Sequence, residues 1–232
     1  KSNPSLIICW CGCFETHTNS VKAKSSGATS YIPNASIASK SFTKQAFKIC
    51  KENNVLFIAD EVQTGIARTG KLLACDHENV KPDVLILGKA LSGGAYPVSV
   101  VLANDSIMKV IKPGQHGSTF GGNPVTTAAG LAAIAVIEKE KLIEKAVLHH
   151  EYLLAELAVI KGVKEVRGAG LLVGIELDSP HAKDFAAKMA KAGVLVNAAN
   201  ESTIRIAPAL IVTQAQLVKF VSIFRKVISD GK

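Results

Sequence analysis

Two carboxylates, Asp60 and Glu61, and one amine, Lys89, each follow an apolar run that is typical of a buried strand. The acids end the run VLFIA at residues 55–59, and the lysine closely follows the run VLIL at residues 84–87. Acids at a strand end usually mark no more than the exit into a solvated loop, and a lysine there is usually a surface residue. The carboxyl edge of parallel strands is, however, where open α/β folds bind ligands, so these side chains are candidates for chemistry.

The types of these side chains indicate what that chemistry would be. A lysine amine that is partly desolvated becomes a nucleophile that can form a Schiff base with a carbonyl compound. An aspartate one strand away suits the ring nitrogen of a pyridine cofactor, because its negative charge stabilises the protonated ring. Asp60 or Lys89 alone is weak evidence, whereas the two residues at equivalent strand ends support each other.

A third element is the segment GQHGSTFGGNP at residues 114–124. Small residues and hydroxyls ahead of a helix can hold a phosphate through backbone N–H groups and through Ser118 or Thr119. The segment is not a nucleotide-binding P-loop, since no Gly-Lys-Ser/Thr sequence follows the glycines. A glycine-rich connection explains the composition equally well, so the sequence leaves both interpretations open.

An alternation of helices and strands is expected to position these residues. Thr43 is expected to cap a first helix that runs through Glu52, and Asn123 followed by Pro124 is a good start for a second. Three strands are predicted in this part of the chain, at residues 55–59, 84–87 and 98–103.

From Leu142 onward the pattern predicts a second, smaller unit. Its last helix is expected to open with a capping box between Thr213 and Gln216. The run VKEVRGAGLLVGIEL is expected to form two strands that Gly168 and Gly170 interrupt. The other predicted elements are helices at 142–159 and 181–192 and strands at 194–197 and 203–206. Together the elements imply an α/β body at residues 44–141 and an α+β domain at residues 142–232.

Composition and charge disfavour two classes of function. The 232 residues are 48% hydrophobic and contain no apolar run long enough to predict a membrane span. The net charge of +8 is uneven, because residues 1–45 carry five lysines against one glutamate while the charges elsewhere alternate in sign. A lysine-rich leader without interleaved aromatic residues is weak evidence for nucleic-acid binding, so we expect neither a nucleic-acid nor a membrane partner.

The cysteines give no strong signal for a metal site or for disulfides. Cys9, Cys11 and Cys13 form a C-x-C-x-C cluster, but no second group of His or Cys follows at zinc-site spacing. Cys50 and Cys75 stand alone, and the odd total of five argues against a secreted disulfide scaffold. We therefore expect no metal and a reducing compartment.

One long run carries a resemblance to a known family. Residues 56–124, from LFIADEVQTG to GSTFGGNP, closely resemble the class III pyridoxal-phosphate aminotransferases. The likeness continues through VRGAGLLVGIEL and STIRIAPALIVT, so it covers about residues 44–229. It implies the fold type I of pyridoxal-phosphate-dependent transferases, an α/β fold present here as a partial large domain and a small C-terminal α+β domain. Within the family the chain is most similar to ornithine aminotransferases, with acetylornithine aminotransferases as the alternative.

The resemblance assigns roles to the residues at the strand ends. Lys89 matches the lysine that holds the cofactor covalently and then moves a proton between substrate and cofactor as general acid and base. Asp60 matches the aspartate that pairs with the ring nitrogen of the cofactor. Gln63 matches the glutamine beside the phenolic oxygen of the cofactor.

The resemblance also implies a partner subunit and a reaction. Ser118 and Thr119 match the segment that reaches the cofactor phosphate of the neighbouring subunit, which implies a homodimer with shared sites. Arg205 matches the arginine that clamps a substrate carboxylate, a task for its bidentate fork. The implied reaction transfers the terminal amino group of ornithine to 2-oxoglutarate. Its products are glutamate and glutamate semialdehyde, which cyclises to pyrroline-5-carboxylate.

The first 43 residues do not resemble the family. In family members a longer first half carries the glycine-rich phosphate turn and the aromatic residue that stacks on the cofactor, and neither is present here. We therefore expect a truncated or frame-disrupted gene product with an irregular leader at residues 1–43. The chain would then be an active aminotransferase or a non-catalytic remnant of one. Relatives occur in bacterial cytoplasm and in mitochondria, so we expect the cytoplasm, or the mitochondrial matrix for a eukaryotic source.

Overall fold

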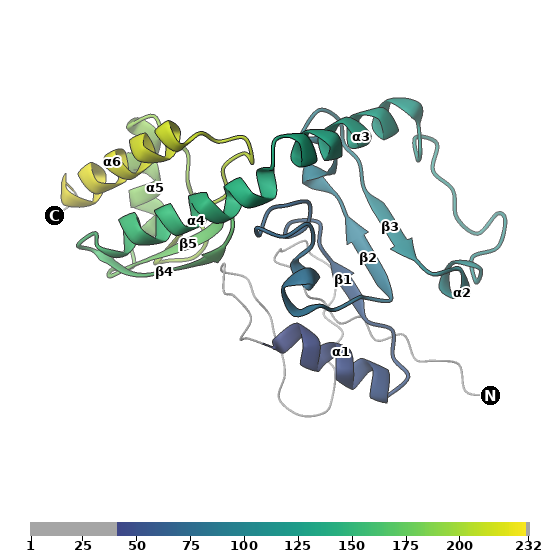
Figure 1. The fold of residues 1–232 in the computed structure, drawn as a ribbon. Coiled ribbons are helices and arrows are strands. Elements are labelled where there is room, and N and C mark those ends of the chain that lie inside the picture. Colours follow the sequence, from purple (N-terminus) through teal and green to yellow (C-terminus); the bar gives the residue numbers. More distant parts are fainter. Residues whose placement is uncertain (1–40, 231–232) are drawn as a thin grey trace. The chain divides into compact units, whose positions relative to one another are not determined.

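The computed structural model describes residues 41–230, which divide into two compact units at residues 41–146 and 147–230 (Figure 1). The expected irregular leader and the cluster of Cys9, Cys11 and Cys13 lie outside the described residues. Within the described range no helix is both long and apolar enough to cross a membrane.

The first unit is built on a three-stranded sheet in the order β1-β2-β3. Strand β1 (Ile58–Asp60) runs parallel to β2 (Val84–Leu87), and β3 (Val100–Ala103) is antiparallel to β2. The predicted bounds of β2 are confirmed, whereas β1 begins three residues later than predicted. The cause is Asp83, whose side chain accepts the backbone N–H of Phe57 at 2.8 Å, so that a carboxylate replaces a backbone partner at this point.

Parallel pairing sets the two strand ends side by side. The register aligns Ile58 with Val84 and Asp60 with Ile86, so the carboxyl ends of β1 and β2 lie at one edge of the sheet. This confirms the expectation that Asp60 and Lys89 leave the sheet at the same edge.

Helix α1 (Phe42–Glu52) begins differently from the prediction. Thr43 is inside the helix, and the residue ahead of the helix is Ser41, which has a positive φ of 73° and makes no side-chain cap. A carboxylate oxygen of Glu78 accepts the backbone N–H of Lys44 at 2.7 Å. The expected cap by Thr43 is therefore wrong, because a side chain from a distant part of the sequence satisfies the first turn.

The remaining helices of the first unit are short except for one. The 3-10 helices are η1 (Ala74–Glu78) and η2 (Lys89–Ser92), and α2 (Asp105–Met108) is a single turn. Helix α3 (Pro124–Lys139) starts as predicted, because the side chain of Asn123 accepts the N–H of Thr126 at 3.0 Å.

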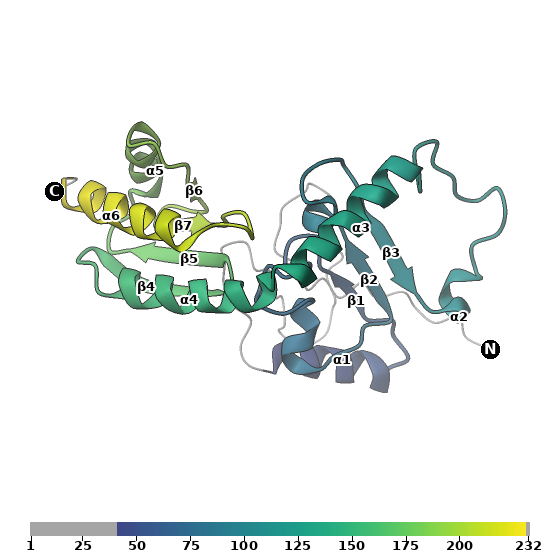
Figure 2. The same cartoon turned by 45° about the horizontal axis from the view of Figure 1, so that its top comes forward.

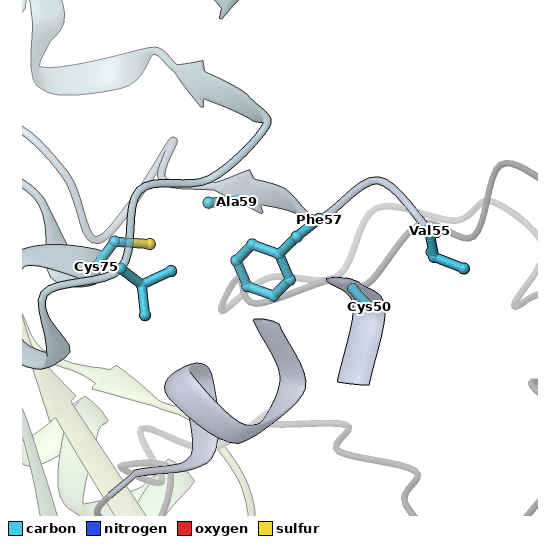
Figure 3. Close-up of a cluster of buried hydrophobic side chains, with 6 residues drawn as sticks. Cys50, Val55, Phe57, Ala59 and Cys75 are labelled. Carbon is cyan, nitrogen blue, oxygen red and sulfur yellow. The ribbon is translucent and has the colours of Figure 1, made fainter. Parts of the chain in front are cut away.

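A small apolar core joins α1, β1 and η1. Figure 3 shows the ring of Phe57 at its centre, with Cys75 on one side and Cys50 on the other. Phe47 of α1 meets the ring of Phe57 edge-on, with centroids 5.6 Å apart. This core packs β1 against α1 and η1, and Asp60 is the last residue of the strand that it holds in place.

The second unit is an antiparallel sheet in the order β4-β5-β7-β6. Its strands are β4 (Val163–Ala169), β5 (Leu172–Leu177), β6 (Asn197–Ala198) and β7 (Thr203–Ile206). The bounds of β7 were predicted, whereas the expected strand at 194–197 shrinks to β6. The N–H of Val194 bonds to the carbonyl of Met189 and so belongs to the end of the preceding helix.

Gly168 does not interrupt its strand, contrary to the prediction. It lies inside β4 with a φ of 156°, and an added Cβ would come within 2.3 Å of the carbonyl oxygen of Leu172. The turn between β4 and β5 is made instead by Gly170, which has a φ of 52°, together with Leu171.

Three helices accompany this sheet, namely α4 (Leu142–Ala158), α5 (Ala182–Lys191) and α6 (Gln214–Asp230). Figures 1 and 2 show α4 and α6 running alongside β5, and Arg225 of α6 is paired with Glu156 of α4 at 2.7 Å. The predicted capping box is confirmed, since Thr213 and Gln216 exchange backbone-to-side-chain hydrogen bonds of 2.9 and 3.3 Å. The fully buried Phe224 packs on Phe185, with ring centroids 4.8 Å apart.

Candidate active site

Asp60 ends β1 with its side chain already oriented. Its Oδ1 accepts the backbone N–H of Val62 at 3.0 Å, which is the hydrogen bond of an Asx turn. The residue is half-buried, and its neighbour along the sheet is Ile86. The local sequence therefore fixes one carboxylate oxygen and directs the chain out of the sheet.

Lys89 begins η2 in a backbone conformation that is uncommon for its residue type. Its φ is 45°, in the left-handed region that costs a residue with a Cβ about 1–2 kcal/mol. Non-glycine residues in such conformations cluster at active sites, where the surrounding structure imposes them. The side chain is exposed in the described chain, so the partial desolvation expected at this strand end is not found there.

Helix α3 supports the turn that carries Lys89. A Cβ added to Gly130 would come within 3.6 Å of the carbonyl oxygen of Leu91, and the side chain of Ala133 lies 3.5 Å from the Cβ position of Gly93. Both distances are ordinary van der Waals contacts, so α3 packs directly on η2. The turn is therefore held from the sheet on one side and from a helix on the other.

Gln63 presents the clearest sign of a group to be bound. Its side-chain oxygen is buried and has no hydrogen-bond partner among residues 41–230. Buried polar atoms are nearly always paired, so an orphan of this kind needs an explanation. A bound molecule with a polar group near Gln63 supplies one, and a carboxylate, an amine and a polar amide at one site fit a protonated pyridine ring that carries an aldehyde and a phenolic oxygen.

Glu61 is the residue whose role sequence reasoning missed. Its side chain is only 1% exposed, although a charged carboxylate is costly to bury. It accepts the backbone N–H groups of Ala74 at 2.6 Å and Cys75 at 2.8 Å. The sequence showed an acid at a strand end, but nothing local indicated that its partners begin 13 residues later.

Ser118 and Thr119 lie on an exposed segment between α2 and α3. This segment extends away from the sheet of its own unit in both views (Figures 1 and 2). The hydroxyl of Ser118 accepts the N–H of Gly121 at 3.0 Å, and an added Cβ at Gly117 or Gly122 would meet nothing within 4 Å. The segment thus offers open backbone and hydroxyls at the start of a long helix.

Arg205 belongs to the second unit, where it lines a cavity. The residue pairs with Gly174 of β5 and with Asn197 of β6. The cavity has a volume of about 630 Å³, and its wall includes Lys219 and Phe220. A guanidinium in a largely apolar wall can bind a carboxylate strongly, because less water competes with it.

A polar network shares the sheet face of Arg205. Glu176 of β5 accepts hydrogen bonds from Ser202 and Thr203 and is paired with Arg167 at 3.0 Å. Cross-strand partners, and residues two apart on one strand, point to the same face, so Arg205 and Glu176 do so. Burial raises the pKa of Glu176, but the hydrogen bonds and the charge of Arg167 outweigh it and bring that pKa to about 2.

Burial is the largest cause of a lowered pKa at two basic side chains, Arg68 and His150. Desolvation lowers the pKa of Arg68, which follows two consecutive residues of positive φ, Ile66 and Ala67. Desolvation also lowers the pKa of His150, whose Nδ1–H donates to the carbonyl of Gly170 at 2.9 Å. Across residues 41–230 no group of three potential ligands is arranged to hold a metal ion.

Comparison with known proteins places these residues in context. The sequence matches the aminotransferase class-III family over residues 35–228, a span that begins before the residue 44 expected from the resemblance. An ornithine aminotransferase of Bacillus cereus (strain 03BB102) is 49% identical over 178 residues, which cover 76% of this chain and 45% of that protein. One from Halalkalibacterium halodurans is 48% identical over 183 residues, covering 78% and 46%.

Solved structures of aminotransferases also match this chain. An acetylornithine aminotransferase from Elizabethkingia anophelis superposes with a TM-score of 0.79 at 50% identity, covering 84% of this chain and 53% of that one. An ornithine aminotransferase from Plasmodium yoelii superposes with a TM-score of 0.79 at 45% identity, covering 86% and 54%. The chain therefore spans about half the length of the relatives it matches.

Proposed function

Because the chain belongs to the class III aminotransferases, we propose that it acts in the pyridoxal-phosphate-dependent transfer of an amino group from ornithine to 2-oxoglutarate. The observation that carries the proposal is the parallel register of β1 and β2, which brings Asp60 and the turn of Lys89 to one edge of the sheet. This is the placement that an amine and an acid acting on one ring require.

The cofactor would be held by residues of the first unit. Pyridoxal phosphate supplies, when bound, an electron-withdrawing ring next to the reacting amino group. Asp60 would keep the ring nitrogen protonated, and Gln63 would lie beside the phenolic oxygen. Lys89 would hold the cofactor covalently and afterwards move a proton as general acid and base. The orphaned oxygen of Gln63 and the imposed φ of Lys89 support this arrangement.

The phosphate would be bound across a homodimer. The exposed segment with Ser118 and Thr119 offers hydroxyls and open backbone, and its extension away from its own sheet suits contact with a second copy of the chain. In this proposal each cofactor receives Asp60 and Lys89 from one subunit and the phosphate contacts from the other.

The two units correspond, in this proposal, to two domains. The first would be the C-terminal part of the cofactor-binding domain, and the second the small domain of the family. Arg205 would bring a substrate carboxylate to the reaction, and the cavity beside it supports that role.

Acetylornithine is the second candidate substrate. Acetylornithine aminotransferase is the name of a structure 50% identical to this chain, while ornithine aminotransferase is the name of the curated relatives at 48–49% identity. The two substrates differ only at one amine, which acetylation renders neutral. The test is to load the purified chain with pyridoxal phosphate and follow the visible band of the lysine-bound cofactor after adding each amino acid.

Each outcome of that test has a meaning. Loss of the band with ornithine but not with N-acetylornithine supports the proposed substrate, and the reverse supports the second candidate. A folded chain that binds the cofactor and responds to neither is a non-catalytic remnant. Lys89→Ala is the control, and we expect it to abolish the band.

We propose a cytoplasmic, reducing compartment for the protein. The side chains of Cys50 and Cys75 are both buried in the core of the first unit, and neither is in a disulfide within the described residues. Buried thiols of this kind are usual where disulfides do not form.

A further inference from the structure

We propose that Glu61 is a positioning residue of the cofactor site. Its buried carboxylate ties the start of the segment 61–75 to the end of that segment and thereby fixes Asp60, one residue before it, and Gln63, two residues after it. The consequence for cofactor binding rests on the proposed function, whereas the effect on the segment itself does not.

The burial of Glu61 requires an explanation that packing alone does not give. The side chain is 1% exposed, and an isolated carboxylate would be very costly in such a place. Its two oxygens are satisfied by the N–H groups of Ala74 and Cys75, and the hydroxyl of Thr64 lies 3.5 Å from one of them. Every strong donor is therefore a backbone group at the beginning of η1.

This arrangement closes a loop. Glu61 lies just after β1, and its backbone N–H bonds to the carbonyl of Ile86 in β2 at 2.8 Å. Its side chain reaches Ala74 and Cys75, at the other end of the segment. One residue thus joins the sheet edge, where the proposed chemistry takes place, to η1 and to the apolar core around Cys75.

The segment so closed is strained and needs an external restraint. Ile66 and Ala67 have φ values of 55° and 67°, and for a β-branched residue such as Ile66 this is a genuine outlier. The N–H of Gly65 bonds to the carbonyl of Glu61 at 2.9 Å, and an added Cβ there would come within 2.8 Å of that oxygen. Strained backbone persists only where the surroundings over-determine it, and the carboxylate of Glu61 provides that restraint.

The restraint acts on two residues that lie close to Glu61 in the sequence. Asp60 precedes Glu61 and accepts the N–H of Val62, and Gln63 lies two residues after Glu61 with its side-chain oxygen buried and unpaired among the described residues. A displacement of Glu61 moves both groups, and catalytic groups must be held within about 0.5 Å of their productive positions.

The chain offers a matched control. Asp76 also places a carboxylate at the start of η1, where it accepts the N–H of Leu73 at 2.9 Å, but it lies within the helix and has no link to the sheet edge. Glu61→Gln and Asp76→Asn each replace a carboxylate by an amide at the same short helix. A purely structural cap would make the two variants behave alike.

The first measurement is hydrogen exchange of the full chain without cofactor. In Glu61→Gln we expect the amides of Val62, Gly65, Ala74 and Cys75 to exchange at least tenfold faster, while those of β2 stay as in the wild type. In Asp76→Asn we expect faster exchange at Leu73 only. Faster exchange in Glu61→Gln that is confined to Ala74 and Cys75 would overturn the proposal, because Glu61 would then be only a cap.

The second measurement is the dissociation constant of pyridoxal phosphate from its visible absorbance. We expect Glu61→Gln to weaken binding about tenfold or more and Asp76→Asn to change it less than twofold. Equal constants for the wild type and a folded Glu61→Gln would overturn the proposal. A wild type that binds no cofactor would overturn the proposed function instead, and the exchange measurement would still decide the role of Glu61.

A wild-type measurement covers the case in which Glu61→Gln does not fold. The amides of Ala74 and Cys75 must then exchange at least tenfold more slowly than those of the exposed Lys71 and Leu72. Equal exchange at all four positions would show that the carboxylate does not hold η1, and the proposal would fail.

Discussion

The two units of the chain differ in how completely they bury their apolar residues. In the second unit the central strands contribute Val173, Ile175 and Ile204, which are fully buried, and Phe224 closes the core. In the first unit Val101 on β3 is 50% exposed and Phe120 is 75% exposed. Exposed large apolar side chains occur in both units, and Val159 and Leu195 of the second are 75% and 90% exposed, but among the described residues more of them belong to the first unit, which carries the residues proposed for the cofactor.

The largest expected effect tests this contrast directly. Phe224→Ala removes a fully buried ring that packs on Phe185 and Phe220, so we expect a loss of about 3–5 kcal/mol in the free energy of unfolding of the second unit. Phe120→Ala is the matched change in the first unit, and we expect it to cost less than about 0.5 kcal/mol. Urea unfolding followed by hydrogen exchange of each unit gives both values.

The contrast between the two units is wrong if Phe224→Ala and Phe120→Ala lower the free energy of unfolding by similar amounts. A cost for Phe120→Ala comparable to that of Phe224→Ala would mean that the exposed segment between α2 and α3 is packed in solution. The first unit would then not be the open one.

A smaller effect concerns acid stability in the second unit. Glu176 has a pKa of about 2, below its ordinary 4.5, so the native state binds fewer protons than the unfolded state as the pH falls below 4.5. Its stabilisation is present above pH 4.5 and is lost as the pH falls through about 2. We expect Glu176→Gln to cost on the order of 1 kcal/mol at pH 7 and much less at pH 2.5, measured by urea unfolding.

The control for that prediction is Glu165→Gln. Glu165 also pairs with Arg167, but its side chain is 60% exposed, so we expect almost no pH-dependent difference. An effect of Glu165→Gln as large as that of Glu176→Gln would show that Arg167, and not the buried network, sets the acid response.

A local strain at the junction between α3 and α4 gives an effect of similar size or smaller. Lys141 is exposed and has a φ of 52° just after α3, a position that favours glycine. We expect Lys141→Gly to raise the free energy of unfolding by about 0.5–1 kcal/mol and Lys145→Gly, inside α4, to lower it by about 1 kcal/mol. Thermal unfolding of the two variants checks the opposite signs, and equal signs would contradict the local account.

The smallest predicted effect is the change in the free energy of unfolding of the second unit as the pH falls from 7.5 to 5.5. Desolvation lowers the pKa of His150 below 6.5, although its bond to Gly170 and the charge of Glu151 act in the opposite direction. The native state therefore binds fewer protons, and stability falls as the pH drops below about 6.5. We expect the wild type to lose more of its free energy of unfolding than His150→Gln does between pH 7.5 and 5.5, measured by urea unfolding. Equal losses would contradict the shift.

The sequence predicted those elements that depend on neighbouring residues. The start of α3 follows from Asn123 and Pro124, and the start of α6 from Thr213 and Gln216, because each cap is complete within a few residues. The bounds of β2 follow from a short apolar run with a break on either side. The edge shared by Asp60 and Lys89 was predictable because parallel pairing follows from the order of elements.

Features that depend on distant residues could not be predicted in this way. The side chain of Glu78 accepts the N–H of Lys44 in the first turn of α1, although the two residues are 34 positions apart. Thr43 is therefore not the cap of this helix. Glu61 found its partners at Ala74 and Cys75, so its burial had no local signal. Lys89 has a φ of 45°, and α3 lies against η2, features that no sequence pattern described.

The most direct test of the account is chemical trapping of the cofactor on the chain. The protein is mixed with pyridoxal phosphate, reduced with borohydride, digested, and analysed by mass spectrometry to find the lysine that carries the pyridoxyl group. The account predicts modification at Lys89 and its loss in Asp60→Ala. A folded chain that carries no pyridoxyl group, or carries it evenly on surface lysines such as Lys71, would contradict the claim that β1 and β2 form the cofactor site.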